Sequence, residues 1–224
     1  MLKAVAVALG LAMANTHSQA SEPFSRDADH DYDAPVPGSY RLPIVKVAPD
    51  GALRDSSGKS VNLRDLIRGR ITVLSFIYTR CAAPKACPYA TGVLNQLHRI
   101  SMDDDALTKN LRLISLSFDP EYDTPERLAT YSEGVNGENA GCEWRFLTAT
   151  SRTELDSILN GYDQAVDKRA DPRDPQGPLY HILRVFLIDG DGRIRNIYSS
   201  GTLDVRLVLS DIKTLLLEQA KRSD

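Results

Sequence analysis

Two short apolar runs limit the folds open to this chain more than any other feature. They are RITVLSFIY at residues 70–78 and LRLISLSF at residues 111–118. Apolar runs of this length are typical of strands that are buried on both faces of a sheet. Because a helical pattern follows each run, the order predicts βα units and a parallel portion of a sheet.

The helix starts are marked by proline and by capping residues. Pro88 predicts the start of the helix after the first run, because proline suits the first turn of a helix. The segment DPEYDTPERLATYS at residues 119–132 predicts a loop and then a helix, with Asp123 or Thr124 as its cap. The S-x-x-E pattern that begins at Ser151 predicts a further helix start.

The last part of the chain predicts a hairpin and a closing helix. A strand in HILRVFLID, at residues 181–189, is followed by the turn DGDGR and a returning strand in IRNIYSS, at residues 194–200. Apolar residues recur at helical spacing from Asp204 onward. The expected fold is therefore α/β and thioredoxin-like, with a central mixed sheet flanked by helices, a late β-hairpin and a C-terminal helix.

The N-terminus has the pattern of an export signal. Lys3 precedes an apolar run at residues 4–14, and small residues follow at Ser18 and Ala20. The run is shorter than the roughly 20 residues that cross a bilayer as a helix. We therefore predict a signal peptide at residues 1–20 and an exported, periplasmic protein without a stable membrane span after cleavage. An uncleaved N-terminal anchor is the alternative.

The rest of the chain is predicted to form an arm and one domain. Residues 21–40 are acidic, contain proline and lack an apolar period, so we expect a flexible arm there and the folded domain at residues 41–224. The 42% of hydrophobic residues is enough to fill a core. The net charge of -3 argues against a nucleic-acid partner, which would require a basic face.

Two cysteines lie on the loop that follows the first buried run. The stretch TRCAAPKACPYA, at residues 79–90, places Cys81 and Cys87 where open α/β sheets bind ligands. Because Cys87 adjoins a helix start, we expect a lowered pKa for its thiol. A structural disulfide, a redox pair and a soft-metal site all remain open. Cys142, the odd cysteine, is expected to pack as a small apolar residue.

His181 is the candidate third ligand of a metal site. It follows a long proline-containing loop and opens the predicted strand that, in a thioredoxin-like sheet, lies beside the cysteine loop. Two cysteines and a histidine suit Cu(I), and also Cu(II) with an added ligand. Structural zinc would require four ligands and a second cysteine pair, which the chain lacks. His98 is expected on the helix after the loop, partly exposed.

Four stretches of the chain resemble the Sco (SenC) family, the thioredoxin-fold copper chaperones of cytochrome c oxidase assembly. The resemblance covers roughly residues 40–218 in order, and its most specific part is SLSFDPEYDTPERLATYS. The four are FIYTRC…CP, SLSFDPEYDTPERLATYS, WRFLTATSRTEL and HILRVFLIDGDGRIRNIYSSG.

The resemblance implies a site and a function. It implies one copper ion per chain, Cu(I) or Cu(II), bound by Cys81, Cys87 and His181, with Asp119 near the site. It implies an exported metallochaperone that delivers copper to the copper-site subunit of cytochrome c oxidase or to another copper acceptor. It also implies a thiol reductase as a second partner, because the ligands must be reduced.

The chain departs from the family pattern in two places. Five residues, AAPKA, separate the cysteines where the family usually has three, and Tyr180 stands where an acidic residue usually precedes the histidine. The alternative function is therefore a periplasmic thiol–disulfide oxidoreductase that uses Cys81 and Cys87. A peroxide-reducing enzyme on the same fold is a weaker alternative, because this chain lacks the residue pattern that such enzymes have around their cysteines. An exported domain with one structural disulfide is a further alternative.

Overall fold

The computed structural model describes residues 32–135 and 141–223 of the chain. The predicted signal peptide at residues 1–20 and the first part of the predicted arm lie outside the described residues. The compact unit that contains the domain begins at Tyr32.

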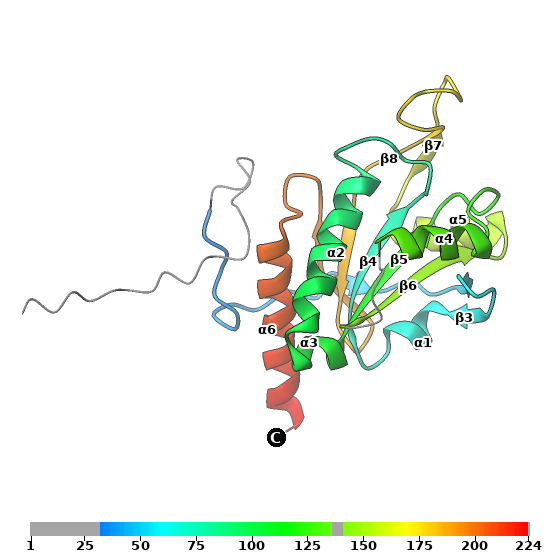
Figure 1. Ribbon diagram of the computed structural model, residues 1–224. Coiled ribbons are helices and arrows are strands. Elements are labelled where there is room, and N and C mark those ends of the chain that lie inside the picture. Colours follow the sequence, from blue (N-terminus) through cyan, green and yellow to red (C-terminus); the bar gives the residue numbers. More distant parts are fainter. Residues whose placement is uncertain (1–31, 136–140, 224) are drawn as a thin grey trace, which may run out of the picture. The chain divides into compact units, whose positions relative to one another are not determined.

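Within the described residues, a mixed sheet of eight strands has the order β1-β10-β9-β4-β5-β6-β2-β3 (Figure 1). β5 pairs in parallel with β4 and β6, and β9 runs antiparallel to β4. A two-stranded ribbon of β7 and β8 is separate from it. The strands are β1 (Lys46–Val47), β2 (Ala52–Asp55), β3 (Ser60–Asn62), β4 (Ile71–Ile77), β5 (Leu111–Ser117), β6 (Glu143–Ala149), β7 (Val166–Lys168), β8 (Leu179–His181), β9 (Val185–Ile188) and β10 (Arg193–Tyr198).

Helices cover both faces of the large sheet. α2 and α6 pack side by side over β4 (Figure 1). α4 lies on the same face, because the hydroxyls of Thr91 in α2 and Tyr131 in α4 are 3.2 Å apart. α1 and α5 cover the opposite face. The helices are α1 (Leu63–Ile67), α2 (Cys87–Met102), α3 (Asp105–Asn110), α4 (Pro125–Val135), α5 (Arg152–Gly161) and α6 (Val205–Ser223).

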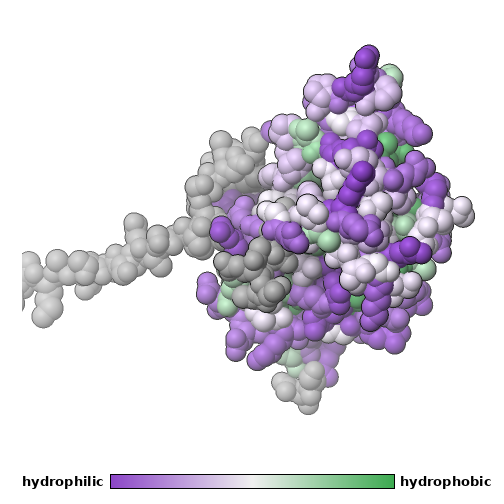
Figure 2. Space-filling model, turned by 45° about the vertical axis from the view of Figure 1, so that its right-hand side comes forward, coloured by the Kyte–Doolittle hydropathy of each residue, from purple (hydrophilic) through white to green (hydrophobic). Residues whose placement is uncertain are grey.

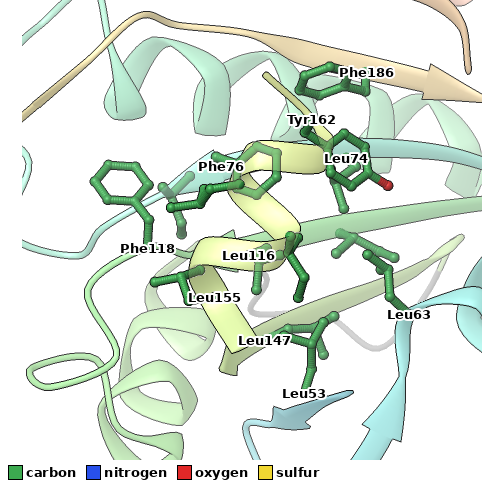
Figure 3. Packing of buried hydrophobic residues seen from close by; sticks show 14 of the residues in the cluster. Leu53, Leu63, Leu74, Phe76, Leu116, Phe118, Leu147, Leu155, Tyr162 and Phe186 are labelled. Atoms are coloured by element: carbon green, nitrogen blue, oxygen red, sulfur yellow. The ribbon is translucent and has the colours of Figure 1, made fainter. Parts of the chain in front are cut away.

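The main apolar core lies between α5, α1 and the sheet (Figure 3). Phe76, Tyr162 and Phe186 meet there edge to face, with ring centroids between 4.9 and 5.9 Å apart. Every residue of β4 and β5 is buried, which confirms that both apolar runs form strands buried on both faces.

The predicted helix starts are confirmed, with one choice resolved. The Ser151 hydroxyl caps α5 by accepting a hydrogen bond from the Glu154 amide at 3.2 Å. At α4 the cap is Thr124, whose hydroxyl accepts from the Arg127 amide at 3.5 Å. Asp123 does not cap this helix, because its carboxylate faces the opposite way, toward the ends of β4 and β5.

Two histidine placements from the sequence are wrong. His181 does not open the strand that leads into the hairpin. It ends β8, and β9 begins at Val185. Between the two strands, the Ile182 carbonyl accepts a hydrogen bond from the Gln164 side chain at 2.9 Å in place of a partner in the large sheet. His98 is buried, and its ring lies 5.9 Å from that of Trp144, because α2 presents this side to the sheet.

The second part of the predicted arm lies along α6. The Tyr40 hydroxyl donates to Asp211 at 2.5 Å, and the Gly38 amide donates to the Thr214 hydroxyl at 3.0 Å. In the described part of the chain, no helix has both the length and the apolar character needed to cross a membrane. The face in Figure 2 is mostly hydrophilic, with hydrophobic residues in small separate patches.

Candidate functional site

The two cysteines of the loop occupy different positions relative to α2. Cys87 is the first residue of α2 and is buried, whereas Cys81 lies in the preceding loop and is partly exposed. The loop and the β7–β8 ribbon lie at the same end of the sheet (Figure 1). Cys81, Cys87 and Cys142 all carry free thiols.

The side chains of Cys81, Cys87 and His181 meet at this end of the sheet. The sulfur of Cys87 lies 3.4 Å from Nε2 of His181. Cys81 lies close enough to both of these side chains for each to lower the pKa of its thiol. Two ligands that each lie about 2.0–2.3 Å from one ion are about 3.5 Å apart, so the Cys87–His181 pair has the spacing of two ligands.

The described residues do not show a complete set of metal ligands. Among residues 32–135 and 141–223, no three His, Cys, Asp or Glu side chains together meet the arrangement of a metal centre. Of the three predicted ligands, Cys81 is the one that lies on an irregular loop, before the start of α2.

The ring of His181 is oriented by its surroundings. Its Nδ1 lies 3.2 Å from the Ile182 carbonyl. A carbonyl only accepts hydrogen bonds, so Nδ1 carries a hydrogen, and Nε2 is the ring nitrogen that faces the Cys87 sulfur. The ring also packs on Phe118, with centroids 4.6 Å apart. These contacts therefore fix the orientation of the ring, with Nε2 toward the cysteine loop.

The two thiols differ in their acidity, in the opposite sense to the expectation from the sequence. The hydrogen bond from Cys87 lowers the pKa of Cys81 to about 4, with further help from His181 and from the amides of Cys87 and Ala83. The pKa of Cys87 is raised, first by its hydrogen bond to Cys81 and then by burial. The predicted low pKa at Cys87 is thus wrong. The helix start stabilises a thiolate on Cys81, the less buried sulfur.

Asp123 connects the ends of two neighbouring strands beneath the cysteine loop. It is fully buried and accepts hydrogen bonds from the Thr79 amide at 3.0 Å, the Thr79 hydroxyl at 2.5 Å and the Ser117 hydroxyl at 2.6 Å. Burial raises the pKa of its carboxyl, and these hydrogen bonds oppose that rise. Because Thr79 lies two positions before Cys81, this carboxylate fixes the backbone that leads to the thiol.

Asp119, the predicted near-site residue, pairs with the residue before Cys81. Its carboxylate lies 2.5 Å from the guanidinium of Arg80. That guanidinium stacks over the ring of Tyr122, 3.9 Å from the centroid, and Arg127 stacks over the same ring at 3.8 Å. Asp119 therefore acts on the cysteine loop through Arg80.

Cys142 is remote from the other two cysteines. It precedes β6, whereas Cys81 follows β4, and β4, β5 and β6 are parallel, so the two lie at opposite ends of the sheet. Burial raises the pKa of its thiol to about 11. Its predicted role as a small, buried apolar residue is confirmed.

Three functional neighbours of the thiols were missed by sequence reasoning. Tyr78 was counted only as the end of a buried run, Asp123 only as a helix cap, and Arg80 not at all. The signal that points to Asp123 is the Thr124–Pro125 pair, because a second capping residue leaves the aspartate free for another role.

The fold and the thiol site define a protein of the thioredoxin-like class. In such proteins a reactive cysteine loop links a buried strand to the start of a helix. Comparison with known proteins narrows this class: the SCO1/SenC family model matches residues 46–217, and the chain belongs to that family.

Individual relatives are moderately similar in sequence. A curated relative described as "SCO1 protein homolog", from Bacillus subtilis, is 26% identical over 162 residues, which cover 72% of this chain and 78% of the relative. The structure of Arabidopsis thaliana ScoI with copper bound has a TM-score of 0.63 at 21% identity and covers 77% of this chain and 99% of that one.

A third similar structure concerns thiol chemistry. It is described as identifying a disulfide switch in BsSco, a member of the Sco family of cytochrome c oxidase assembly proteins. It has a TM-score of 0.61 at 22% identity and covers 79% of this chain and 98% of that one. Both structures support the thioredoxin-like fold assigned here.

Proposed function

We propose that this protein binds one copper ion between Cys81, Cys87 and His181 and delivers it to a copper enzyme, with the copper-site subunit of cytochrome c oxidase as the foremost acceptor. The observation that supports this most directly is the 3.4 Å separation of the Cys87 sulfur and Nε2 of His181, with Cys81 in contact with both. The copper-bound relative and the oxidase-assembly relative point the same way.

The donor set suits copper as a transferred ion. Thiolate sulfur and imidazole nitrogen are the ligands that Cu(I) prefers. Cys81 is already a thiolate at neutral pH and is partly exposed, so an acceptor thiol meets this ligand first. Cys87 and His181 are buried and release the ion later. The exchange requires both cysteines to be reduced, which is the reason for a thiol reductase as a second partner.

We infer from the predicted signal at residues 1–20 that the protein is exported and that this chemistry takes place in the periplasm. In an oxidising compartment a reduced dithiol persists only where a reductase or a bound metal protects it. The proposed location and the proposed reductase therefore depend on each other.

A second function is favoured by the unequal acidity of the two thiols. A partly exposed thiolate at Cys81 beside a buried thiol at Cys87 is the arrangement of an attacking and a resolving cysteine. In that reaction Cys81 attacks a target disulfide and forms a mixed disulfide, and the target's leaving thiolate takes up a proton. Cys87 then loses its proton and attacks the Cys81 sulfur, which releases the second target thiolate and leaves the chain oxidised.

A Cu(I) titration of the reduced mature chain against a competing chelator tests the copper proposal. We expect one ion per chain, and an affinity at least about 100-fold lower in His181→Ala, since even outer-shell partners of a metal contribute about 10–100-fold. His98→Gln removes the other imidazole of the described residues and should leave the affinity unchanged.

The same variants separate the two functions. Copper binding that is indifferent to His181, together with rapid reduction of a model disulfide by the wild type, would support the oxidoreductase and contradict the copper site.

A further inference from the structure

Tyr78 connects the cysteine loop to the strand that carries His181. Its side chain is buried, and it lies three positions before Cys81. Its hydroxyl is 3.0 Å from the Leu179 carbonyl and 3.1 Å from the Gln176 carbonyl. Both carbonyls belong to the segment that runs directly into His181 at the end of β8.

A second contact holds the same two segments together. The Ala82 amide donates to the Gln176 carbonyl at 3.2 Å. At Gly177 a Cβ atom would lie 2.3 Å from the Tyr78 hydroxyl and 2.7 Å from the Arg80 carbonyl, and its φ is +102°. Only glycine permits this approach, so residues 176–179 lie directly against the cysteine loop.

The main sheet does not fix the position of His181. β8 is three residues long and pairs only with β7, outside the large sheet. The contacts that bring His181 to the thiols are therefore side-chain and loop contacts. Phe118 adds a further contact of this kind. The centroid of its ring lies 5.1 Å from that of Tyr78 and 4.6 Å from that of His181.

We propose that Tyr78 is a positioning residue, whose hydroxyl holds residues 176–179 on the cysteine loop and thereby sets the distance between His181 and the two sulfurs. This inference rests on the proposed copper site. The hydroxyl touches no ion. It acts mainly through the segment that carries His181, and its side chain also interacts with that of Cys81. Its effect on copper must therefore be smaller when His181 is absent.

A double-mutant cycle on Cu(I) affinity tests this dependence. Tyr78→Phe keeps the ring and its packing on Phe118 and removes only the hydroxyl. We expect the affinity to fall about three- to tenfold, as for one lost hydrogen bond. The fall should be clearly smaller when Tyr78→Phe is added to His181→Ala. Tyr162→Phe is the matched control, since that buried hydroxyl has no hydrogen-bond partner among the described residues.

The copper-free, reduced protein provides an independent measurement. In Tyr78→Phe we expect faster hydrogen exchange at the Ala82 amide and shifted NMR signals of the His181 ring, neither of which Tyr162→Phe should show. If His181→Ala leaves copper binding intact, the proposed copper site is contradicted. The positioning role of Tyr78 is then tested by the hydrogen exchange and the NMR signals alone. Unchanged signals in Tyr78→Phe, or an equal loss of affinity with and without His181, overturn the inference.

Discussion

Cys81 and Cys87 have the same side chain but different acidity, because the two thiols interact and their surroundings differ. Cys87 is almost completely buried at the start of α2, and an ionised sulfur there would lose its hydration. Cys81 is partly exposed and accepts hydrogen bonds from Cys87 and from two amides. The negative charge therefore settles on Cys81, and its presence opposes ionisation of Cys87.

The pH dependence of alkylation should reveal this division. With a pKa of about 4, Cys81 should react with iodoacetamide at a nearly constant rate from pH 8 to pH 5 and slow only as the pH falls through about 4. Because 4 lies below the ordinary 9.0, the associated free energy of unfolding should also decline as the pH falls from about 9 toward 4.

Cys87→Ala is the control for this profile, since it removes the main cause of the low pKa. The midpoint of alkylation should move upward in that variant. A midpoint near 9 in the wild type would contradict the assignment of the thiolate to Cys81.

At the scale of elements, the site depends on how the ends of β4 and β5 are joined. Asp123 sits between these strand ends and satisfies the donors of Thr79 and Ser117, whereas Asp119 makes a more exposed ion pair with Arg80. Both aspartates belong to one short motif, but Asp123 is fully buried, whereas Asp119 keeps some exposure to solvent.

We therefore expect unequal losses of stability from the two alanine variants. Asp123→Ala leaves several buried donors without an acceptor and should lower the free energy of unfolding by about 3 kcal/mol. Asp119→Ala removes a partly exposed pair and should lower it by less than about 1 kcal/mol. Urea unfolding of the reduced, metal-free protein measures both, and similar losses would show that Asp123 does not support the loop as described.

At the scale of the whole molecule, a buried arginine joins three segments far from the thiols. The guanidinium of Arg195 lies 2.6 Å from the Leu42 carbonyl, 3.0 Å from Asp189 and 2.9 Å from Glu218. It thereby connects the segment before β1, the β9–β10 hairpin and α6. The cysteine loop is at the opposite end of β4 from this cluster, since Gly190 of the hairpin bonds to Gly69, just before β4.

Stability and copper affinity should therefore separate in Arg195→Met. Removing one partner of a buried ion pair is expected to lower the free energy of unfolding by about 3–5 kcal/mol, while Cu(I) affinity in the absence of denaturant stays the same. Arg222→Met, which breaks an exposed pair with Asp191, is the matched control and should change stability by less than about 1 kcal/mol. A parallel loss of copper affinity in Arg195→Met would mean that the two ends of the molecule are coupled.

The amino-acid sequence by itself determined the fold class, the buried strands β4 and β5 and the starts of α2 and α5. These depend on local rules, in which apolar runs bury strands and proline or serine marks a helix start. The family motifs also identified the three candidate ligands, Cys81, Cys87 and His181. That these three residues bind copper stays a prediction.

Only the tertiary structure decided which thiol is ionised, where His181 lies and what Asp123 and Tyr78 do. Cys87 and His181 are 94 positions apart, and no local pattern relates them. Burial and hydrogen bonding set the pKa of a thiol and the orientation of a ring, and both depend on segments that are distant in the chain. For that reason the prediction of one acidic cysteine near the helix start was correct, but its assignment to Cys87 was wrong. In the folded loop it is Cys81 whose pKa is lowered.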